Sequence, residues 1–319
     1  MSMLYITEQQ VRDLLPMTDA IALVGKAFER LASGEALNQP RRRLILPTGS
    51  VLHYMAASDG QYYGAKIYAT NPRRGAHFLF LLYRAADAEP LAILEANYLG
   101  QIRTGAASAV ATKFMARPDA ATLAIIGSGF QAHTQLEAML ALRPISEVRV
   151  WSRDPSKRDT FATDAAARFG VPVRAVTPAD QAVRGADIVI TATNAREPVL
   201  DSEWVAPGAH INAMGSNQAN RREIPTALVE RAGLIAVDSI EQARMESGDL
   251  LMAWENADWS GYPIVELRDV VTRRIEARTA PEQITLFKSN GLAVEDVIAA
   301  AFVYERAVAA GIGSPVAHS

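Results

Sequence analysis

A glycine-rich turn between a predicted strand and a predicted helix constrains the fold of this chain more than any other feature. The apolar run at residues 122–126 (TLAII) leads directly into residues 127–132 (GSGFQA), and a helical pattern continues to Leu142. Glycines permit a tight turn in which backbone N–H groups approach a pyrophosphate, and a small residue after the turn lets the helix pack closely on the strand. The arrangement therefore predicts a dinucleotide-binding turn. The residues assigned to it are Gly127, Gly129, Phe130, Gln131 and Ala132.

The alternation of strand and helix continues after this turn. Helices are expected at residues 132–142 and 156–169, and further buried strands at residues 148–151, 188–191, 210–213 and 234–237. Alternating strands and helices of this kind form a parallel sheet with helices on both faces. The second half of the chain is therefore predicted to be a doubly wound α/β domain of the Rossmann type.

The first hundred residues follow a different pattern. Residues 8–33 have apolar side chains at helical spacing, interrupted at Pro16, and residues 42–99 contain short apolar runs separated by turn signals. We expect helix over the first stretch, an antiparallel sheet over the second, and then a helix from Arg103 to Met115. Together these elements predict a mixed α+β domain. A last apolar helix, residues 294–310, could close either domain.

The composition narrows the class of protein. Of the 319 residues, 49% are apolar and 21% are charged, and the net charge is −3. Because the net charge is slightly negative, we do not expect nucleic acid as a partner. Because the sequence has no long apolar stretch, we do not expect it to span a membrane. The N-terminus lacks the basic-then-apolar layout of a signal peptide, which favours a cytoplasmic location. Cysteine is absent and the histidines are scattered, so thiolate chemistry and disulfides are excluded and no metal site is expected.

The end of the second predicted strand of the Rossmann domain bears on the choice of dinucleotide. NAD sites usually carry an acidic residue there, which binds the ribose hydroxyls. This chain instead has Ser152 and Arg153, which could hold the 2′-phosphate of NADP, followed by Asp154. We therefore assign Ser152 and Arg153 to the cofactor and expect either NAD(H) or NADP(H), with the preference between them left open.

Six segments, taken in order, identify a family resemblance over nearly the whole chain. They are Arg43, residues 64–66 (GAK), residues 102–108 (IRTGAAS), the glycine turn, residues 212–216 (NAMGS) and residues 287–291 (FKSNG). Each segment is weak alone, but their order and spacing are specific. The chain resembles the ornithine cyclodeaminase/mu-crystallin family, which includes cyclodeaminases, alanine dehydrogenases, ketimine and imine reductases, and a mammalian lens protein.

The resemblance implies a subunit of two domains. Residues 1–116 with 295–319 would bind the substrate and form a homodimer, and residues 117–294 would form the Rossmann domain. Apolar strands in the N-terminal domain need cover, which a dimer that shares that sheet would provide.

The resemblance also implies that Arg43, Lys66 and Arg103 hold the substrate carboxylate and the reacting nitrogen. Arginine binds a carboxylate through two parallel charge-assisted hydrogen bonds. A partly desolvated lysine can protonate an imine and so make it a better hydride acceptor. Without the resemblance, Arg43 could equally be a solvated edge-strand residue, and Arg103 could simply help a helix meet its neighbour.

Further family positions surround the nicotinamide and the substrate. Those that match the nicotinamide site are Thr193, Met214, Gly215, Ser216, Arg221 and Ser289. Asn217 and Asn290 are assigned to the substrate together with Arg43, Lys66 and Arg103. Several of these residues end or follow predicted parallel strands, and the carboxyl ends of strands are where ligands bind in such sheets.

One departure from the family pattern separates the possible activities. Ornithine cyclodeaminases carry an acid/base aspartate two residues after the glycine that matches Gly215, whereas this chain has Asn217. Asparagine cannot accept a proton near pH 7. We therefore expect NAD(P)-dependent reduction of a small imino acid to an L-amino acid, or its reverse, with iminosuccinate as one candidate substrate. The alternatives are ornithine cyclodeaminase and a non-catalytic protein that binds NADP and a small ligand.

Overall fold

The computed structural model describes residues 3–71, 73–254 and 259–316, and the chain divides into two compact units. Unit 1 comprises Met1–Arg103 and Gly291–Ser319, and unit 2 comprises Thr104–Asn290. The extreme ends of the predicted N-terminal domain, residues 1–2 and 317–319, lie outside the described residues. Within the described ranges, no helix combines the length and apolar character needed to cross a membrane.

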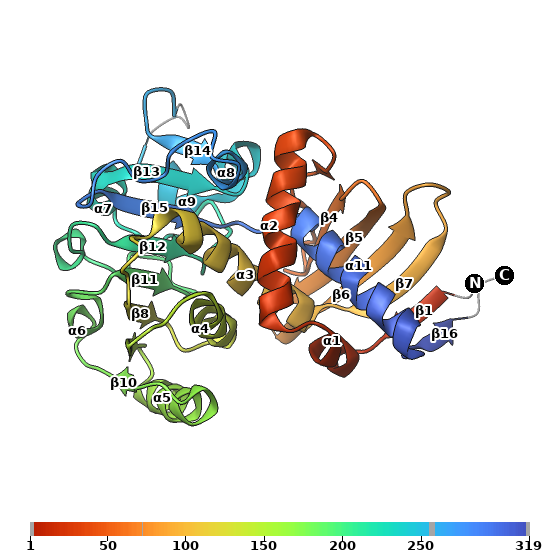
Figure 1. Ribbon diagram of the computed structural model, residues 1–319, viewed down its shortest axis with the longest axis horizontal. Coiled ribbons are helices and arrows are strands. Elements are labelled where there is room, and N and C mark those ends of the chain that lie inside the picture. Colours follow the sequence, from red (N-terminus) through yellow and green to blue (C-terminus); the bar gives the residue numbers. More distant parts are fainter. Residues whose placement is uncertain (1–2, 72, 255–258, 317–319) are drawn as a thin grey trace. The chain divides into compact units, whose positions relative to one another are not determined.

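Unit 2 is built on a sheet of eight parallel strands in the order β10–β9–β8–β11–β12–β15–β13–β14 (Figure 1). The strands are β8 (Thr122–Ile126), β9 (Glu147–Trp151), β10 (Val173–Ala175), β11 (Ile188–Thr191), β12 (His210–Ala213), β13 (Ala232–Val237), β14 (Ile264–Glu266) and β15 (Ile284–Lys288). The chain leaves β8 for β9 and β10 on one side and returns to β11 on the other. Because ligands bind outside the carboxyl ends of strands at such a switch point, this order places the site. The predicted doubly wound parallel sheet is confirmed.

Helices and one 3₁₀ turn connect these strands. They are α4 (Phe130–Leu142), α5 (Pro155–Phe169), α6 (Asp180–Val183), η1 (Ser202–Trp204), α7 (Thr226–Arg231), α8 (Ile240–Glu246), α9 (Gly248–Leu251) and α10 (Leu267–Val271). The four residues of β11 and of β12 are all buried, including the polar His210 and Asn212 of β12. The core of unit 2 lies on and around the central strands.

Unit 1 is a second sheet covered on one face by helices. Its strands are β1 (Met3–Ile6), β2 (Leu37–Asn38), β3 (Arg42–Ile45), β4 (Val51–Ser58), β5 (Tyr62–Asn71), β6 (Arg74–Arg84), β7 (Pro90–Glu95) and β16 (Ser314–Val316). Strands β3 to β7 pair antiparallel, as predicted, but β1 pairs parallel with β7, so the sheet is mixed. Helices α1 (Glu8–Leu14) and α2 (Met17–Ser33) are separated at Pro16, and α11 (Ala293–Ala310) lies across β4, β5 and β6 (Figure 1). The last helix thus belongs to unit 1.

Helix α3 (Asn97–Met115) begins six residues earlier than the predicted start at Arg103. The reason is a long-range cap. The Glu8 carboxylate accepts hydrogen bonds from the N–H groups of Asn97 at 3.2 Å and Tyr98 at 2.7 Å, which the first turn of a helix leaves unsatisfied. This partner lies 89 residues from Asn97 in sequence, so no local pattern could indicate it.

Candidate functional site

The glycine turn of unit 2 connects β8 to α4, and its two glycines have different reasons to be glycine. Gly127 has φ +111°, and a Cβ there would lie 2.4 Å from the Ala192 carbonyl oxygen, so the fold itself requires glycine. Gly129, the N-cap of α4, has φ −87°, and a Cβ there would meet nothing within 4 Å. The fold therefore leaves open space beside Gly129, at a helix N-terminus that favours an anion.

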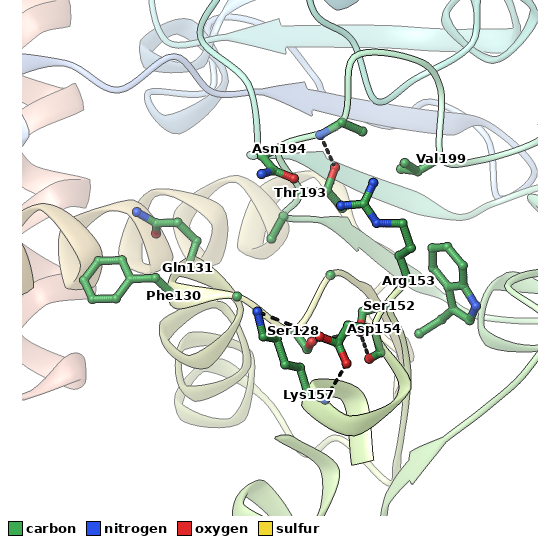
Figure 2. A pocket seen from close by; sticks show the side chains of 16 residues that line it. Ser128, Phe130, Gln131, Ser152, Arg153, Asp154, Lys157, Thr193, Asn194 and Val199 are labelled. Atoms are coloured by element: carbon green, nitrogen blue, oxygen red, sulfur yellow. Dashed lines mark hydrogen bonds and ion pairs between the residues drawn. The ribbon is translucent and has the colours of Figure 1, made fainter. Parts of the chain in front are cut away.

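This space is part of a pocket of about 530 Å³ (Figure 2). It is lined by Gly127, Ser128, Gly129, Phe130, Gln131, Trp151, Ser152, Arg153, Asp154, Lys157, Ala192, Thr193, Asn194, Ala195, Val199 and Gly215. In Figure 2, Ser128, Ser152, Asp154 and Lys157 gather at one end, and Thr193, Asn194 and Val199 at the other. The Oε1 atom of Gln131 is buried with no hydrogen-bond partner among the described residues. An open helix N-terminus and an orphaned acceptor fit a bound dinucleotide.

The structure brings most of the sequence-predicted cofactor residues together in this pocket. Gly127, Gly129, Phe130, Gln131, Ser152, Arg153, Thr193 and Gly215 line it, whereas Ala132, Met214, Ser216, Arg221 and Ser289 do not. Ala132 is fully buried in α4, where its small side chain permits close packing. Arg221 donates a hydrogen bond to the carbonyl of Asn194, a lining residue, at 3.2 Å. Ser289 follows β15 and donates to the Asp238 carboxylate at 3.1 Å.

The turn after β9 shows how the acidic residue near the pocket is used. Asp154 is the N-cap of α5, and its Oδ1 accepts a hydrogen bond from the Lys157 N–H at 3.2 Å. The strand-end position is occupied by Ser152, whose hydroxyl accepts a hydrogen bond from Ser128 at 2.8 Å and donates to the Asp154 carbonyl at 3.1 Å. The carboxylate that could have bound ribose hydroxyls is therefore engaged in capping a helix.

Unit 1 contains a second site, a group of buried charges beneath α11. The Lys66 side chain on β5 lies 2.9 Å from Asp296 Oδ1, and Lys66 is only 3% exposed. Arg103 donates from Nη1 to Glu295 at 2.9 Å and from Nε to Asp296 at 3.3 Å. The pKa of Lys66 is lowered to about 8: burial is the largest cause, Asp296 opposes it, and Arg103 and Arg41 add to the lowering. Burial would raise the pKa of Asp296, but the two cations outweigh it and hold that pKa low.

Two glycines make room for these cations. A Cβ on Gly100, in α3, would lie 2.4 Å from Lys66 Nζ. A Cβ on Gly291 would lie 2.4 Å from Arg103 Nη1, and Gly291 also has φ +79°. The segment FKSNG therefore supplies the gap for Arg103, whereas the gap for Lys66 is at Gly100, two residues before the segment IRTGAAS.

An aromatic row lies on the same sheet face as Lys66. The rings of His53 and Tyr68 stack 4.3 Å apart, those of Tyr68 and Phe78 stack 4.4 Å apart, and Lys66 Nζ lies 5.2 Å from the centre of the Phe78 ring. Arg43 pairs in register with His53 and so shares this face. Burial, followed by the charges of Arg43 and Arg41, lowers the pKa of His53 to about 4, so His53 is neutral at pH 7. The row offers a flat apolar wall beside the cations.

The remaining substrate assignments lie at the ends of strands in unit 2. Asn217 is half-buried in the loop after β12, and Asn290 is 5% exposed and donates its backbone N–H to Asp238. Sequence reasoning missed Arg41, Glu295 and Asp296. Two adjacent acidic residues at the start of a largely apolar helix were the available signal for the latter pair.

Comparisons with known proteins identify a family and relatives to which this chain is similar. The profile of the ornithine cyclodeaminase/mu-crystallin family matches residues 2–311. Delta(1)-pyrroline-2-carboxylate reductase of Bacillus cereus is 35% identical over 98% of this chain and 99% of its own length. The structure of the Thermococcus litoralis enzyme of that name, with NADH and L-proline, is 33% identical over 98% of this chain and all of its own, with a TM-score of 0.94. The iminosuccinate reductase of Paracoccus denitrificans with NAD⁺ is 25% identical over the whole of both chains, with a TM-score of 0.91.

Proposed function

This chain belongs to the ornithine cyclodeaminase/mu-crystallin family, and from that premise we propose that it reduces a small imino acid to an L-amino acid with a nicotinamide dinucleotide. The observation that carries this proposal is the buried lysine of unit 1, held 2.9 Å from Asp296 with Arg103 beside the same carboxylate. A lysine with a pKa of about 8 is a proton donor suited to neutral pH. The dinucleotide pocket of unit 2 supports the same activity.

In the proposed reaction each residue has a defined task. When bound, the reduced dinucleotide supplies a hydride to the imine carbon. Lys66 gives its proton to the imine nitrogen, so that C=N becomes an amine, and Asp296 holds the ammonium in place. Arg43 and Arg103 align the substrate carboxylate, and Glu295 fixes the guanidinium of Arg103 at 2.9 Å. The reverse reaction would oxidise the amino acid through the same groups.

A cyclic imino acid such as Δ1-pyrroline-2-carboxylate is the substrate that we favour. It carries one carboxylate for the arginines and an apolar ring for the row formed by His53, Tyr68 and Phe78. Iminosuccinate is the second candidate. Arg41 and Arg43 both lower the pKa of His53, and these two cations could bind a second carboxylate. Ornithine is disfavoured, because Asn217 offers no charge to its distal ammonium.

A substrate panel tests the activity. We expect the protein to oxidise NADH or NADPH in the presence of Δ1-pyrroline-2-carboxylate, and more slowly with iminosuccinate or with pyruvate plus ammonia, followed by the loss of nicotinamide absorbance. Ornithine with NAD⁺ should release no ammonia. Release of ammonia and proline from ornithine would instead make the protein a cyclodeaminase. Tight dinucleotide binding without turnover of any imine would make it a binding protein.

We also propose that unit 1 forms a homodimer through the outer face of its sheet, which is the face that does not carry Lys66. Large apolar side chains are exposed there, among them Leu44 at 55%, Tyr54 at 47% and Leu79 at 42%. A contiguous exposed apolar face of this kind marks an interaction surface. In the register of the sheet, Tyr54 and Leu79 both pair with Ile67 and so share one face.

Light scattering at micromolar concentration should report about twice the chain mass of 34.5 kDa. Leu79→Glu should shift the particle to the monomer, because it places a charge in the apolar face. Val308→Glu changes another exposed apolar residue of unit 1, on α11, and should leave the mass unchanged. A wild-type monomer would rule out the dimer.

A further inference from the structure

The carboxylate of Glu223 is fully buried at the carboxyl ends of β11 and β12. Its Oε1 accepts hydrogen bonds from both the N–H and the hydroxyl of Thr193, each at 2.7 Å. Its Oε2 accepts from the Gly215 N–H at 2.7 Å and from the Thr191 hydroxyl at 2.9 Å. One side chain therefore ties the segment after β11 to the segment after β12.

A second buried acid and a buried lysine support Glu223 from behind. Asp249 Oδ1 accepts hydrogen bonds from the N–H groups of Glu223 at 2.6 Å and Ile224 at 2.9 Å. Asp249 Oδ2 lies 2.9 Å from Lys288 Nζ, which donates to the Ser216 carbonyl at 2.6 Å. Burial raises the pKa of Glu223, and Lys288 opposes that rise. Both Asp249 and Lys288 are fully buried.

A buried network of charges such as this one has a free-energy cost for the folded state. Buried charges lose their hydration, and well-packed apolar residues would often stabilise a core as well or better. Here the network lies against the pocket: Thr193 and Gly215 are lining residues, and the N–H of Val199, another lining residue, donates to the Glu223 carbonyl at 2.9 Å. A Cβ on Gly215 would lie 2.4 Å from Glu223 Oε1, so the glycine permits this close approach.

We propose that Glu223 is a positioning residue that holds the part of the dinucleotide pocket formed by Thr193 and Gly215, while Asp249 and Lys288 fix Glu223. The inference rests on the proposed function. In a doubly wound sheet the dinucleotide spans two mononucleotide-binding halves. The half built on β8 and β9 carries the glycine turn and Ser152, and therefore takes the adenosine end. The half built on β11 and β12 takes the nicotinamide end, so loss of Glu223 should disturb that end alone.

Calorimetric titration with NADH, NADPH and ADP tests this assignment. In Glu223→Gln the amide keeps one acceptor oxygen but directs an N–H group at a backbone donor. We expect the affinity for NADH and NADPH to fall at least about tenfold, while the affinity for ADP stays within about twofold. Thr191→Val removes one hydroxyl donor with little change of shape, and should reduce the same affinities by a smaller factor.

Glu246→Gln is the matched control, because Glu246 is another buried glutamate of unit 2, with a hydrogen bond from Gln242 at 2.8 Å. It should leave all three affinities unchanged. Equal losses for ADP and for the dinucleotides in Glu223→Gln would show a purely structural role, and unchanged dinucleotide affinity would also overturn the proposal. If Glu223→Gln does not fold, the loss of dinucleotide affinity relative to ADP affinity is measured on Thr191→Val instead, and the same criteria apply. A wild type that binds neither NADH nor NADPH would overturn the proposed function, and this inference with it.

Discussion

Lys66→Met should lower kcat for imino acid reduction by about 10²–10⁴-fold, the range over which a positioned proton donor accelerates a reaction. Methionine has a side chain of similar length but no proton to give. Dinucleotide affinity should change little, because the pocket belongs to unit 2 and Lys66 to unit 1. Steady-state kinetics on the best substrate of the panel, together with calorimetry on the dinucleotide, measure the two effects separately.

The pH dependence gives a second readout of the same residue. Because burial and neighbouring cations lower the pKa of Lys66 to about 8, the free protein loses this proton as the pH rises through that value. The proposed reduction needs the protonated amine, so kcat/KM should be level below a pH of about 8 and should fall above it. The residual activity of Lys66→Met should lack this decline. Lys26→Met, at an exposed position on α2, should keep both the rate and the pH profile. Undiminished reduction by Lys66→Met would leave bound water as the proton source.

Gly100→Ala tests the same ammonium without removing it. The new Cβ would lie 2.4 Å from Lys66 Nζ, and the lysine end must move to accommodate it. In a helix, alanine is otherwise more stable than glycine by about 0.5–1 kcal/mol. We therefore expect the melting temperature to hold or rise while kcat falls, as measured by calorimetry and kinetics. A variant with normal kcat would show that the exact place of the ammonium is unimportant.

The fold could be predicted from the sequence wherever local patterns determine it. The buried strands β8 and β11 are short, largely apolar runs, and the glycine turn fixes the first βα connection, so the Rossmann sheet followed directly. Partners distant in sequence could not be predicted in this way. Helix α3 starts at Asn97 because Glu8 caps it, and β1 joins the sheet parallel to β7 because of tertiary pairing. Each of these features depends on a residue about ninety positions away.

The candidate site shows the same difference between features set by local patterns and features set by partners distant in sequence. The glycine turn and the two residues after β9 follow strands directly, so the sequence indicated that they would lie together, and they line one pocket. The partners of Lys66 did not follow from the sequence. Asp296 lies 230 residues from Lys66, on a helix whose apolar pattern says only that it is buried. Glu223 likewise stands in a loop without a motif, and only the folded sheet brings it to Thr193 and Gly215.

Gly129→Val should abolish dinucleotide binding and leave the protein folded. A Cβ at Gly129 would meet no atom of the protein within 4 Å, and its φ of −87° suits any residue. The branched side chain would therefore occupy the space through which the backbone approaches a pyrophosphate. We expect calorimetry to detect no binding of NADH or NADPH, and circular dichroism to give a wild-type spectrum.

Two other glycines separate this effect from a general loss of structure. Gly127→Ala places a Cβ 2.4 Å from the Ala192 carbonyl oxygen at φ +111°, so it should lower the melting temperature as well as the affinity. Gly75→Val, at an exposed position in β6 where a Cβ also meets nothing within 4 Å, should alter neither property. The contrast makes the test specific, because of these three glycines only Gly129 combines free space for a Cβ with a place in the lining of the pocket. Wild-type affinity for both dinucleotides in Gly129→Val would refute the assignment of this turn to the cofactor.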